Sequence, residues 1–524
     1  MLETRSSSST GAAADVLIIG GGINGCGIAR DLAGRGLRVV LCEQHDLAAH
    51  TSSASTKLIH GGLRYLEYGE FALVRKALAE REVLLRLAPH LIRPMRFVIP
   101  HDPSMRPAWM MRAGLWLYDH LARRDWLPAS GTIDLRRHPA GAPLQPHWRR
   151  AFHYADAWVD DARLVVLNAV DAAARGAQVY TRTRCAALRR AADGWSATLQ
   201  PLGAPSWTLR ARVVVNATGP WAESVLQQQC GLSPRRHLRL VRGSHIVVPR
   251  LFRHDDAYLL QASDRRVVFA IPYLDRYTLI GTTDVEHRGD PATARIDADE
   301  IDYLCREAAR YFRRPLRRSD VVWHYSGVRP LLEDASNDPS AVTRDYLLDL
   351  DTAGGAPVLT VWGGKITTYR TLAQEAARCL RAVLPLSAAD WTARCPLPGG
   401  DLEAVVGSCA DPVQAMQRFE AYVGQRWPWL PESCARRWPR AYGTRMLSWL
   451  EPARRLADLG EPIAPGLFEA ELRHWVECEW ACSADDVLWR RSKLGLALGA
   501  AEQQRVAAWL QRHMGLGCGT PDKP

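Results

Sequence analysis

The chain has 524 residues, of which 47% are hydrophobic and 23% charged, a composition typical of a folded protein and not of a disordered one. Its net charge of +11 favours an anionic partner, such as a phosphorylated substrate or an acidic membrane surface. No apolar run approaches the ~18 residues of a membrane-spanning helix. The twelve cysteines include no CxxC pair, so we expect no bound metal.

The first predicted unit is a strand, a turn and a helix followed by a second strand. Residues 15–19 are apolar and β-branched, which is typical of a buried parallel strand. A glycine-rich turn follows at residues 20–25, a helix is expected over 26–34, and residues 39–42 predict the second strand. Together they form one βαβ unit of about 30 residues, the size of the units that bind dinucleotides.

The turn carries the glycine pattern GxGxxG at Gly20, Gly22 and Gly25. The first glycine permits the tight turn, the second lets a pyrophosphate approach the backbone, and the third allows helix and strand to pack closely. Asn24 lies in the same turn, at a helix N-terminus that favours a phosphate. Glu43 follows the second strand, where a carboxylate binds ribose hydroxyls and disfavours the 2′-phosphate of NADP. The sequence therefore predicts a dinucleotide site, and not a glycine turn of purely structural use.

Further elements predict two more structural units. Apolar residues recur at helical spacing over 70–87, and a strand over 212–215 leads into residues 216–219. Between about residues 238 and 350, short β-like runs alternate with turns, which predicts an antiparallel sheet in a second domain. The breaker cluster at 396–400 marks a boundary, and the remainder, rich in Ala, Leu, Arg and Trp, predicts a helical C-terminal domain.

Three features favour FAD over NAD as the bound dinucleotide. The fingerprint lies close to the N-terminus, a second half is built around residues 216–220, and the chain has no second GxGxxG. Without a separate NAD site, electrons have to come directly from a substrate. We therefore expect an FAD-dependent oxidoreductase.

Five sequence blocks extend this expectation to a family. Together with the fingerprint they closely resemble the FAD-dependent, quinone-linked glycerol-3-phosphate dehydrogenases of bacteria, and the resemblance runs from about residue 14 to 515. The blocks are TSSASTKLIHGGLRYLE at 51–67, GSHIVVP at 243–249, IGTTD at 280–284, YSGVRP at 325–330 and GGKITTYR at 363–370.

The resemblance implies the architecture. The expected fold class is α/β: a glutathione-reductase-like, D-amino-acid-oxidase-like FAD-binding Rossmann fold with an antiparallel-sheet substrate cap and a helical C-terminal domain. The FAD-binding domain is then expected at residues 14–92, 150–237 and 345–390. The cap is expected at 93–149 and 238–344, and the C-terminal domain at 396–524.

The resemblance also implies the reaction and the partners. Such enzymes oxidise sn-glycerol 3-phosphate at C2 to dihydroxyacetone phosphate, and the reduced flavin passes electrons to membrane quinone. We therefore expect FAD as cofactor, a homodimer, and a cytoplasmic location with peripheral attachment to the anionic inner face of the cytoplasmic membrane. No nucleic-acid partner is expected, because no basic tract with interleaved aromatic residues is present.

A phosphorylated substrate requires cations in fixed geometry, and arginine is favoured because its planar fork matches phosphate oxygens. Arg64 and Arg329 lie in the family blocks beside rigid turn residues, and Lys365 follows a double glycine. Arg344 is a weaker candidate, since an ion pair with Asp345 explains it equally well. For Thr283, a tight turn is nearly as good an explanation as substrate binding. The expected substrate-binding residues are Arg64, Tyr65, Thr283, Arg329, Arg344 and Lys365.

Oxidation of a secondary alcohol requires a group that accepts the hydroxyl proton while hydride leaves the carbon, and histidine suits this role. His60 and His245 both lie in family blocks and are the candidate bases, although either could be structural. Arg329 is a third candidate catalytic residue, because an arginine can stabilise the developing alkoxide.

Hydroxyl residues and glycines in the blocks are expected to contact FAD. Ser52, Ser53 and Lys57 follow the ribose-binding acid, although they can equally form the N-cap of a short helix. Gly363 and Gly364 are expected near the pyrimidine end of the flavin. The expected FAD contacts are Gly20, Gly22, Asn24, Gly25, Glu43, Ser52, Ser53, Lys57, His60, Gly61, Thr218, Gly219, Gly363, Gly364, Lys365 and Thr367.

Three alternative activities stay open at this point. A glycerol-3-phosphate oxidase would pass electrons to oxygen and is expected to carry an extra insertion, of which none is evident. An amino-acid oxidase would need a carboxylate and amine site in place of the phosphate cations. A non-catalytic protein that binds FAD or nucleic acid would not need Arg64, Arg329, Lys365 and both histidines.

A lipid-soluble quinone requires contact with the bilayer. The segment 106–124 combines arginines with Trp109, Met110 and Trp116 and is a candidate for surface attachment. The alternative is an ordinary amphipathic helix that packs on the core. Residues 489–493 pose the same choice.

Overall fold

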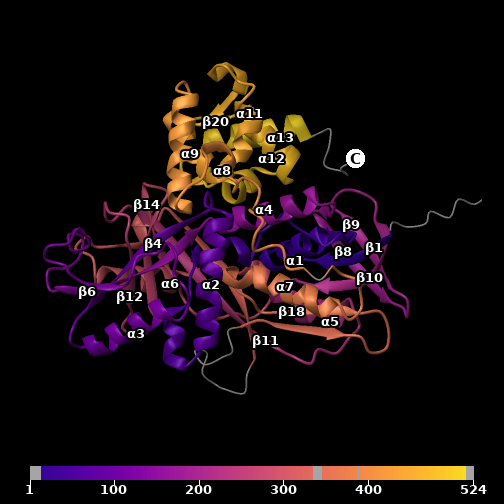
Figure 1. Ribbon diagram of the computed structural model, residues 1–524, viewed down its shortest axis with the longest axis horizontal. Coiled ribbons are helices and arrows are strands. Elements are labelled where there is room, and N and C mark those ends of the chain that lie inside the picture. The colour runs from indigo at the N-terminus through magenta and orange to yellow at the C-terminus, as the bar shows by residue number, and fades with distance from the viewer. Residues whose placement is uncertain (1–12, 334–344, 388, 515–524) are drawn as a thin grey trace, which may run out of the picture.

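The computed structural model describes residues 13–333, 345–387 and 389–514. Two large sheets lie side by side, and the C-terminal helices form a separate layer above them (Figure 1). The chain crosses repeatedly between the two sheets, so residues far apart in sequence meet where the sheets adjoin.

The first sheet is the predicted Rossmann sheet. Its central strand β1 pairs in parallel with its neighbours β2 and β10, and the hairpin of β8 (Thr183–Arg190) and β9 (Trp195–Pro201) continues antiparallel from β10. Only β17 runs antiparallel within the main path, against β18. The strand order is β17 (Leu347–Asp351), β18 (Val358–Trp362), β10 (Trp207–Asn216), β1 (Ala13–Ile19), β2 (Val39–Cys42) and β7 (Gln178–Tyr180).

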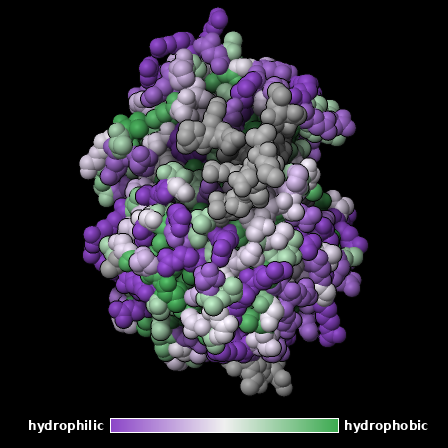
Figure 2. All heavy atoms as spheres, turned by 90° about the vertical axis from the view of Figure 1, so that its right-hand side faces the viewer, coloured by the Kyte–Doolittle hydropathy of each residue, from purple (hydrophilic) through white to green (hydrophobic). Residues whose placement is uncertain are grey.

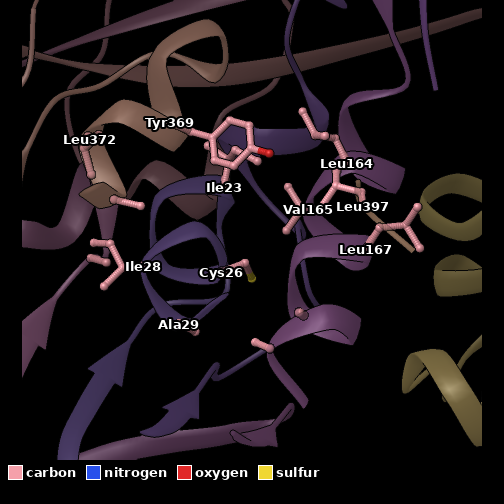
Figure 3. Packing of buried hydrophobic residues seen from close by; sticks show 14 of the residues in the cluster. Ile23, Cys26, Ile28, Ala29, Leu164, Val165, Leu167, Tyr369, Leu372 and Leu397 are labelled. Atoms are coloured by element: carbon pink, nitrogen blue, oxygen red, sulfur yellow. The ribbon is translucent and has the colours of Figure 1, made fainter. Parts of the chain in front are cut away.

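Three helices cover one face of this sheet: α1 (Ile23–Gly34), α4 (Asp161–Ala174) and α7 (Tyr369–Leu380). Figure 3 shows Cys26 of α1 on the side toward Val165 of α4, with Tyr369 of α7 close to the start of α1. Gly27 permits this approach, since an added Cβ would lie 2.7 Å from the Tyr369 ring. These side chains are almost fully buried, and each such apolar side chain contributes about 2 kcal/mol by leaving water.

The second sheet corresponds to the predicted cap, and its strands pair antiparallel except for β12 and β4, which pair in parallel. Three helices pack against its strands: α2 (Phe71–Leu87), α3 (Ala108–His120) and α6 (Ala298–Ala309). Along its path lie β15 (Val285–Glu286), β11 (Leu238–Pro249), β14 (Tyr277–Gly281), β13 (Val267–Tyr273), β12 (Ala257–Gln261), β4 (Ile92–His101), β6 (Arg150–Val159) and β3 (Leu58–Ile59); β16 (Trp323–Leu332) pairs with β11, and β5 (Gly131–Asp134) with β6.

One segment lies in a different sheet from the one we expected. Residues 150–159 were assigned to the FAD-binding domain, but as β6 they pair along their whole length with β4 in the cap sheet. The partner strand is about fifty residues away in the sequence, so no local pattern could show the pairing. The short strand β3, also assigned to the FAD-binding domain, pairs with β6 in the same sheet.

The C-terminal part is helical, as predicted. Its helices are α8 (Glu403–Val406), α9 (Pro412–Arg426), α10 (Glu432–Tyr442), α11 (Leu447–Leu450), α12 (Glu469–Glu479) and α13 (Ala500–Met514), with a hairpin of β19 (Pro462–Ala464) and β20 (Leu467–Phe468). Buried ion pairs join it to the first sheet's domain: Arg163 with Glu479, and Arg491 with Asp46. Losing one partner of such a pair leaves an uncompensated buried charge, so these contacts fix how the layers dock.

Within the described residues, no helix is both long enough and apolar enough to cross a membrane.

Candidate active site

The glycine turn after β1 has the shape that a dinucleotide requires. Gly20 has φ +112°, and a Cβ there would lie 2.6 Å from the carbonyl oxygen of Ala217. A Cβ on Gly25 would overlap the carbonyl oxygen of Gly20. Both positions therefore accept only glycine, because the atoms they would strike belong to the backbone. The turn thus brings the N-terminus of α1 to the edge of the sheet.

The second glycine of the pattern leaves room for a ligand. Gly22 is the N-cap of α1, with φ −82° and no side chain of its own to cap the helix. Ser52 comes in from a distant loop, and its hydroxyl accepts a hydrogen bond from the Ile23 amide at 3.0 Å. No acidic residue lies in the first turn of α1, so no side chain of the helix itself offsets its positive N-terminal end.

Glu43 lies against this turn, at the position predicted for a ribose ligand. Its carboxylate accepts hydrogen bonds from the amides of Gly21 at 2.7 Å and His45 at 2.8 Å. Burial raises the pKa of Glu43, and the two amide hydrogen bonds oppose that shift. The side chain is thereby held in one orientation.

The opposite edge of the cradle is built from β10 and β18. Gly219, Gly363 and Gly364 all have positive φ, at +58°, +72° and +105°. Asn24 of α1 donates to the Gly363 carbonyl at 3.2 Å, while its buried Oδ1 has no partner among the described residues. Thr218 donates to Asn216 Oδ1 at 2.7 Å. The bare backbone and the unsatisfied Asn24 oxygen are what a polar, planar cofactor would contact, so the residues present fit FAD.

A first group of candidate catalytic residues lies just beyond the cradle. The His60 amide donates to the Thr367 hydroxyl at 3.2 Å, and Lys365 Nζ lies 4.1 Å from the centre of the Tyr65 ring. Burial lowers the pKa of His60, Asp156 opposes the shift, and Lys365 adds to it. His60 is therefore neutral at pH 7, as a proton acceptor must be.

Arg64 belongs to the same group. Its side chain is half-buried, and no carboxylate of residues 13–333, 345–387 or 389–514 lies within 4 Å of it. A half-buried guanidinium without a carboxylate partner favours the binding of an anion.

A second group comes from the cap sheet. His245 on β11 stacks on Tyr325 of β16 with ring centres 4.8 Å apart, and its Nε2 lies 3.0 Å from the Thr56 hydroxyl. Its Nδ1 is buried and has no partner among the described residues. Burial lowers the pKa of His245 well below its usual value, and the charges of Lys57 and Arg329 act in the same direction. This histidine is also neutral.

Arg329 lies on the same face of the cap sheet. Its guanidinium pairs with Asp284 at 2.8 Å and donates to the Thr283 carbonyl at 2.8 Å. The Thr283 hydroxyl itself donates to buried Glu300 at 2.6 Å and accepts from the Ser244 amide. The structure therefore gives the Thr283 side chain a role in the cap, with its backbone holding Arg329. Arg344 lies outside the described residues.

The segment 51–57, which leads to His60, also contacts the strand that carries Arg329. Tyr325 Oη donates to the Ser55 carbonyl at 2.7 Å, and Thr51 Oγ1 donates to the Val328 carbonyl at 2.7 Å. A Cβ on Gly363 would lie 3.5 Å from the Pro330 carbonyl oxygen, so the end of β16 adjoins the glycines before Lys365. The structure thus brings together the predicted residues of four sequence blocks.

Two predicted FAD contacts, Lys57 and Ser53, form hydrogen bonds that hold this segment. Lys57 is buried, and its ammonium group lies 2.7 Å from Asp161 and donates to the Ser53 carbonyl. Ser53 Oγ donates to the His50 carbonyl at 3.2 Å. Their described hydrogen bonds are structural, and Asp161, the residue that anchors Lys57, was not identified from the sequence.

Comparison with known proteins supports the family. A family model described as FAD dependent oxidoreductase matches residues 15–370, and one described as the C-terminal domain of alpha-glycerophosphate oxidase matches 391–517. A glycerol-3-phosphate dehydrogenase from Pseudomonas aeruginosa is 50% identical over 95% of each chain. The chain belongs to the glycerol-3-phosphate dehydrogenase family of FAD-dependent oxidoreductases. The predicted family and its FAD cofactor are thereby confirmed.

Two further comparisons qualify this result. A D-erythritol 1-phosphate dehydrogenase from Brucella abortus is 48% identical over 94% of this chain and 97% of its own length. The crystal structure of a glycerol-3-phosphate dehydrogenase from Bacillus halodurans, complexed with FAD, aligns with a TM-score of 0.76 at 24% identity, covering 97% of this chain and 92% of the other. The structural likeness confirms the predicted fold. The Brucella abortus relative shows that proteins about equally similar to this chain are named for different substrates.

Sequence reasoning missed several residues that support the site. Thr56 and Asp156 each contact a predicted catalytic residue or its loop, and Tyr118 lies behind Gly61. None of them stands in a recognisable motif with its partner, because the contacts join segments dozens to hundreds of residues apart. Thr56 lies in the 51–67 block and Tyr118 in the segment 106–124, where it was grouped with the candidate membrane contacts; the sequence assigned neither of them a role in the site.

Proposed function

We propose that this protein oxidises the C2 hydroxyl of sn-glycerol 3-phosphate to give dihydroxyacetone phosphate. The proposal is supported by three cationic side chains and two neutral histidines in segments that adjoin the glycine cradle: Arg64, Arg329 and Lys365, with His60 and His245. When bound, FAD supplies the acceptor for the hydride that leaves C2. The residues of the chain bind the phosphate, orient C2 and accept the hydroxyl proton.

His60 is the better candidate for the base. Its ring forms no hydrogen bond with the described residues, and its side chain is partly accessible. The Nε2 atom of His245, by contrast, is already bonded to Thr56, and the ring is 2% exposed. We assign the proton acceptor to His60, while His245 orients Thr56 as a neutral partner.

The phosphate is assigned to the cations. Arg64 has no carboxylate partner in the described part of the chain, and Lys365 lies over the ring of Tyr65, the next residue along. Arg329 is held by Asp284 and the Thr283 carbonyl, so its guanidinium is already oriented before substrate binds. A pre-oriented guanidinium loses less side-chain entropy on binding than a mobile one.

A second candidate substrate is a longer polyol phosphate, because a relative of nearly equal identity is a D-erythritol 1-phosphate dehydrogenase. The two are distinguished by comparing kcat/KM for sn-glycerol 3-phosphate and D-erythritol 1-phosphate with the same artificial acceptor. We expect glycerol 3-phosphate to be preferred at least tenfold, roughly the discrimination that one small substituent gives in a fitted site. A higher kcat/KM for D-erythritol 1-phosphate would assign the longer substrate, with the same residues still assigned to the phosphate.

We further propose that electrons leave the reduced flavin for a membrane quinone, and not for oxygen. The test is to reduce the bound flavin anaerobically and then follow its reoxidation by a short-chain quinone and, separately, by air-saturated buffer. Fast recovery with quinone and slow recovery with oxygen is expected. Fast recovery with oxygen would instead assign an oxidase.

Contact with an anionic membrane is proposed for one face of α3. Trp109, Trp116 and Met110 are 70%, 57% and 42% exposed, while Leu115 and Tyr118 on the other face are buried. Exposed tryptophans on a basic protein are typical of attachment at the membrane surface. The helix lies at the lower left of Figure 1, and the opposite side of the molecule mixes hydrophilic side chains with smaller hydrophobic areas (Figure 2).

The membrane proposal is tested by sedimentation with anionic and with neutral phospholipid vesicles. We expect the protein to sediment with anionic vesicles, and Trp109→Ser combined with Trp116→Ser to release it without loss of flavin. Val322, an exposed side chain outside α3, gives the control Val322→Ser. Equal binding of the double variant would refute the assignment. The homodimer stays a prediction, which analytical ultracentrifugation of the FAD-bound protein tests.

A further inference from the structure

The loop that carries His60 and Arg64 is held from behind by one buried tyrosine. The Gly61 amide donates to Tyr118 Oη at 2.9 Å, and this hydroxyl donates to the Asp156 carboxylate at 2.8 Å. An ionised carboxylate only accepts hydrogen bonds, and an amide N–H only donates them. The direction of the chain is therefore fixed, from amide to hydroxyl to carboxylate.

Arg81 completes the chain through an ion pair with the Asp156 carboxylate. Its Nη1 lies 2.6 Å from Asp156 Oδ1 and donates to the Ala155 carbonyl at 2.9 Å. Tyr118, Asp156 and Arg81 are all nearly inaccessible, at 2%, 2% and 4% exposure. Burial raises the pKa of Tyr118 well above its usual value, and Asp156 adds to the shift, so the hydroxyl keeps its proton. The three residues come from three elements, α3, β6 and α2.

The loop has little freedom to move between its contacts. A Cβ on Gly61 would lie 2.5 Å from Leu78 and 2.7 Å from Tyr118 Oη, so the backbone packs directly on these two side chains. On its other side, the His60 amide is bonded to the Thr367 hydroxyl. The backbone amides of His60 and Gly61 are thus held by groups from two distant segments, Thr367 and Tyr118.

We propose that Tyr118 is a positioning residue of the substrate site: its hydroxyl, oriented by Asp156 and Arg81, sets the place of the loop that carries His60 and Arg64. Tyr118 does not itself contact substrate. The proposal rests on the proposed function for the roles of His60 and Arg64. It assigns a function in the reaction to a side chain on the buried face of α3.

The test is Tyr118→Phe in the full-length, FAD-loaded protein. The variant keeps the ring in its packing against Tyr154 and removes only the hydroxyl. Hydrogen exchange of the peptide containing Gly61 is expected to become roughly tenfold faster, because the amide loses the closer of its two acceptors and keeps only the 3.4 Å contact with Asp156 Oδ1. The value of kcat/KM for the polyol phosphate that reduces the flavin is expected to fall roughly 10- to 100-fold, with flavin content unchanged.

Tyr154→Phe is the matched control. This ring is also buried and lies 5.7 Å from Tyr118, edge to face, but its hydroxyl does not contact the loop. It should show wild-type exchange at Gly61 and wild-type kinetics. A Tyr118→Phe protein with unchanged exchange, or with faster exchange and unchanged kcat/KM, would overturn the proposal.

A second variant covers the case in which Tyr118→Phe does not fold. Asp156→Asn keeps the shape of the side chain and both rings, and it removes the charge that orients the hydroxyl. As with Tyr118→Phe, the hydrogen exchange of the Gly61 amide should become faster and kcat/KM should fall. Wild-type exchange and kinetics would overturn the proposal. The exchange experiment needs no substrate, so it reports on Tyr118 even if the proposed function fails.

Discussion

Replacing Gly22 with alanine separates the binding of FAD from the folding of the turn that binds it. Gly22 has φ −82° and ψ −177°, which alanine adopts readily, and the added Cβ would lie 3.1 Å from the Ser52 hydroxyl. That hydroxyl has to move by only a few tenths of an ångström. We therefore expect the free energy of unfolding of the apoprotein to change by less than about 1 kcal/mol.

The effect on FAD should be much larger. The new methyl group stands where a pyrophosphate approaches the N-terminus of α1. Losing two amide hydrogen bonds to a charged phosphate costs about 3–6 kcal/mol, since each contributes about 1.5–3 kcal/mol. The dissociation constant for FAD should therefore rise roughly 10²- to 10⁴-fold.

The assay titrates deflavinated protein with FAD by fluorescence and follows denaturation of the apoprotein in urea. Two variants bracket the result. Gly25→Ala should destabilise the apoprotein by about 3 kcal/mol or more, because its Cβ strikes backbone. Gly424→Ala on α9 meets no atom within 4 Å and should bind FAD normally. FAD affinity within threefold of wild type in Gly22→Ala would refute this account of the cradle.

Three further predictions concern the site and the fold. Arg329→Met should raise KM for glycerol 3-phosphate about 100-fold, because a charge-assisted contact to phosphate is lost. The melting temperature should change little, because the partly exposed ion pair with Asp284 contributes little to stability. An unchanged KM would show that Arg329 does not bind the substrate. His60→Gln should lower kcat about 10²- to 10⁴-fold. Because burial lowers the pKa of His60, the kcat/KM of the wild-type protein should begin to fall only below pH 6.5. A decline that starts above pH 6.5 would contradict this assignment. Burial lowers the pKa of His90 to about 3, so the unfolded chain binds the extra proton and stability falls as pH drops below 6.5, by about 2 kcal/mol at pH 5. Urea denaturation at pH 7 and pH 5 should show that difference reduced in His90→Asn, and an equal pH dependence in the variant would contradict it.

The sequence predicted best what is local. The unit from β1 to β2 has its strand, glycines, helix and acid within about thirty residues, and the structure has them as expected. The cradle glycines at 363 and 364 also have the positive φ that a close approach requires. In each case the backbone conformation is set by residues next to one another in the chain.

What the sequence did not show depends on distant partners. Lys57 was expected at FAD, but Asp161, 104 positions away, takes its charge. Residues 150–159 form a strand, and only its pairing with β4 places it in the cap sheet. The sequence predicts only that Tyr118 is part of an amphipathic helix. Its proposed role depends on contacts with Gly61 and Asp156, each about 40–60 residues away. The sequence of a charged residue or of a strand does not identify the residue or strand that it pairs with, so these contacts are known only from the folded structure.

The most direct test of the central claim is rapid anaerobic mixing of the FAD-bound protein with sn-glycerol 3-phosphate, unlabelled or deuterated at C2. The flavin absorbance should bleach with formation of dihydroxyacetone phosphate, and the deuterated substrate should bleach it several-fold more slowly, because the bond from C2 to hydrogen breaks in that step. Absence of bleaching in fully flavinated protein would contradict the assignment of the substrate. Bleaching at the same rate with both substrates would show that a step other than hydride transfer from C2 limits the reduction.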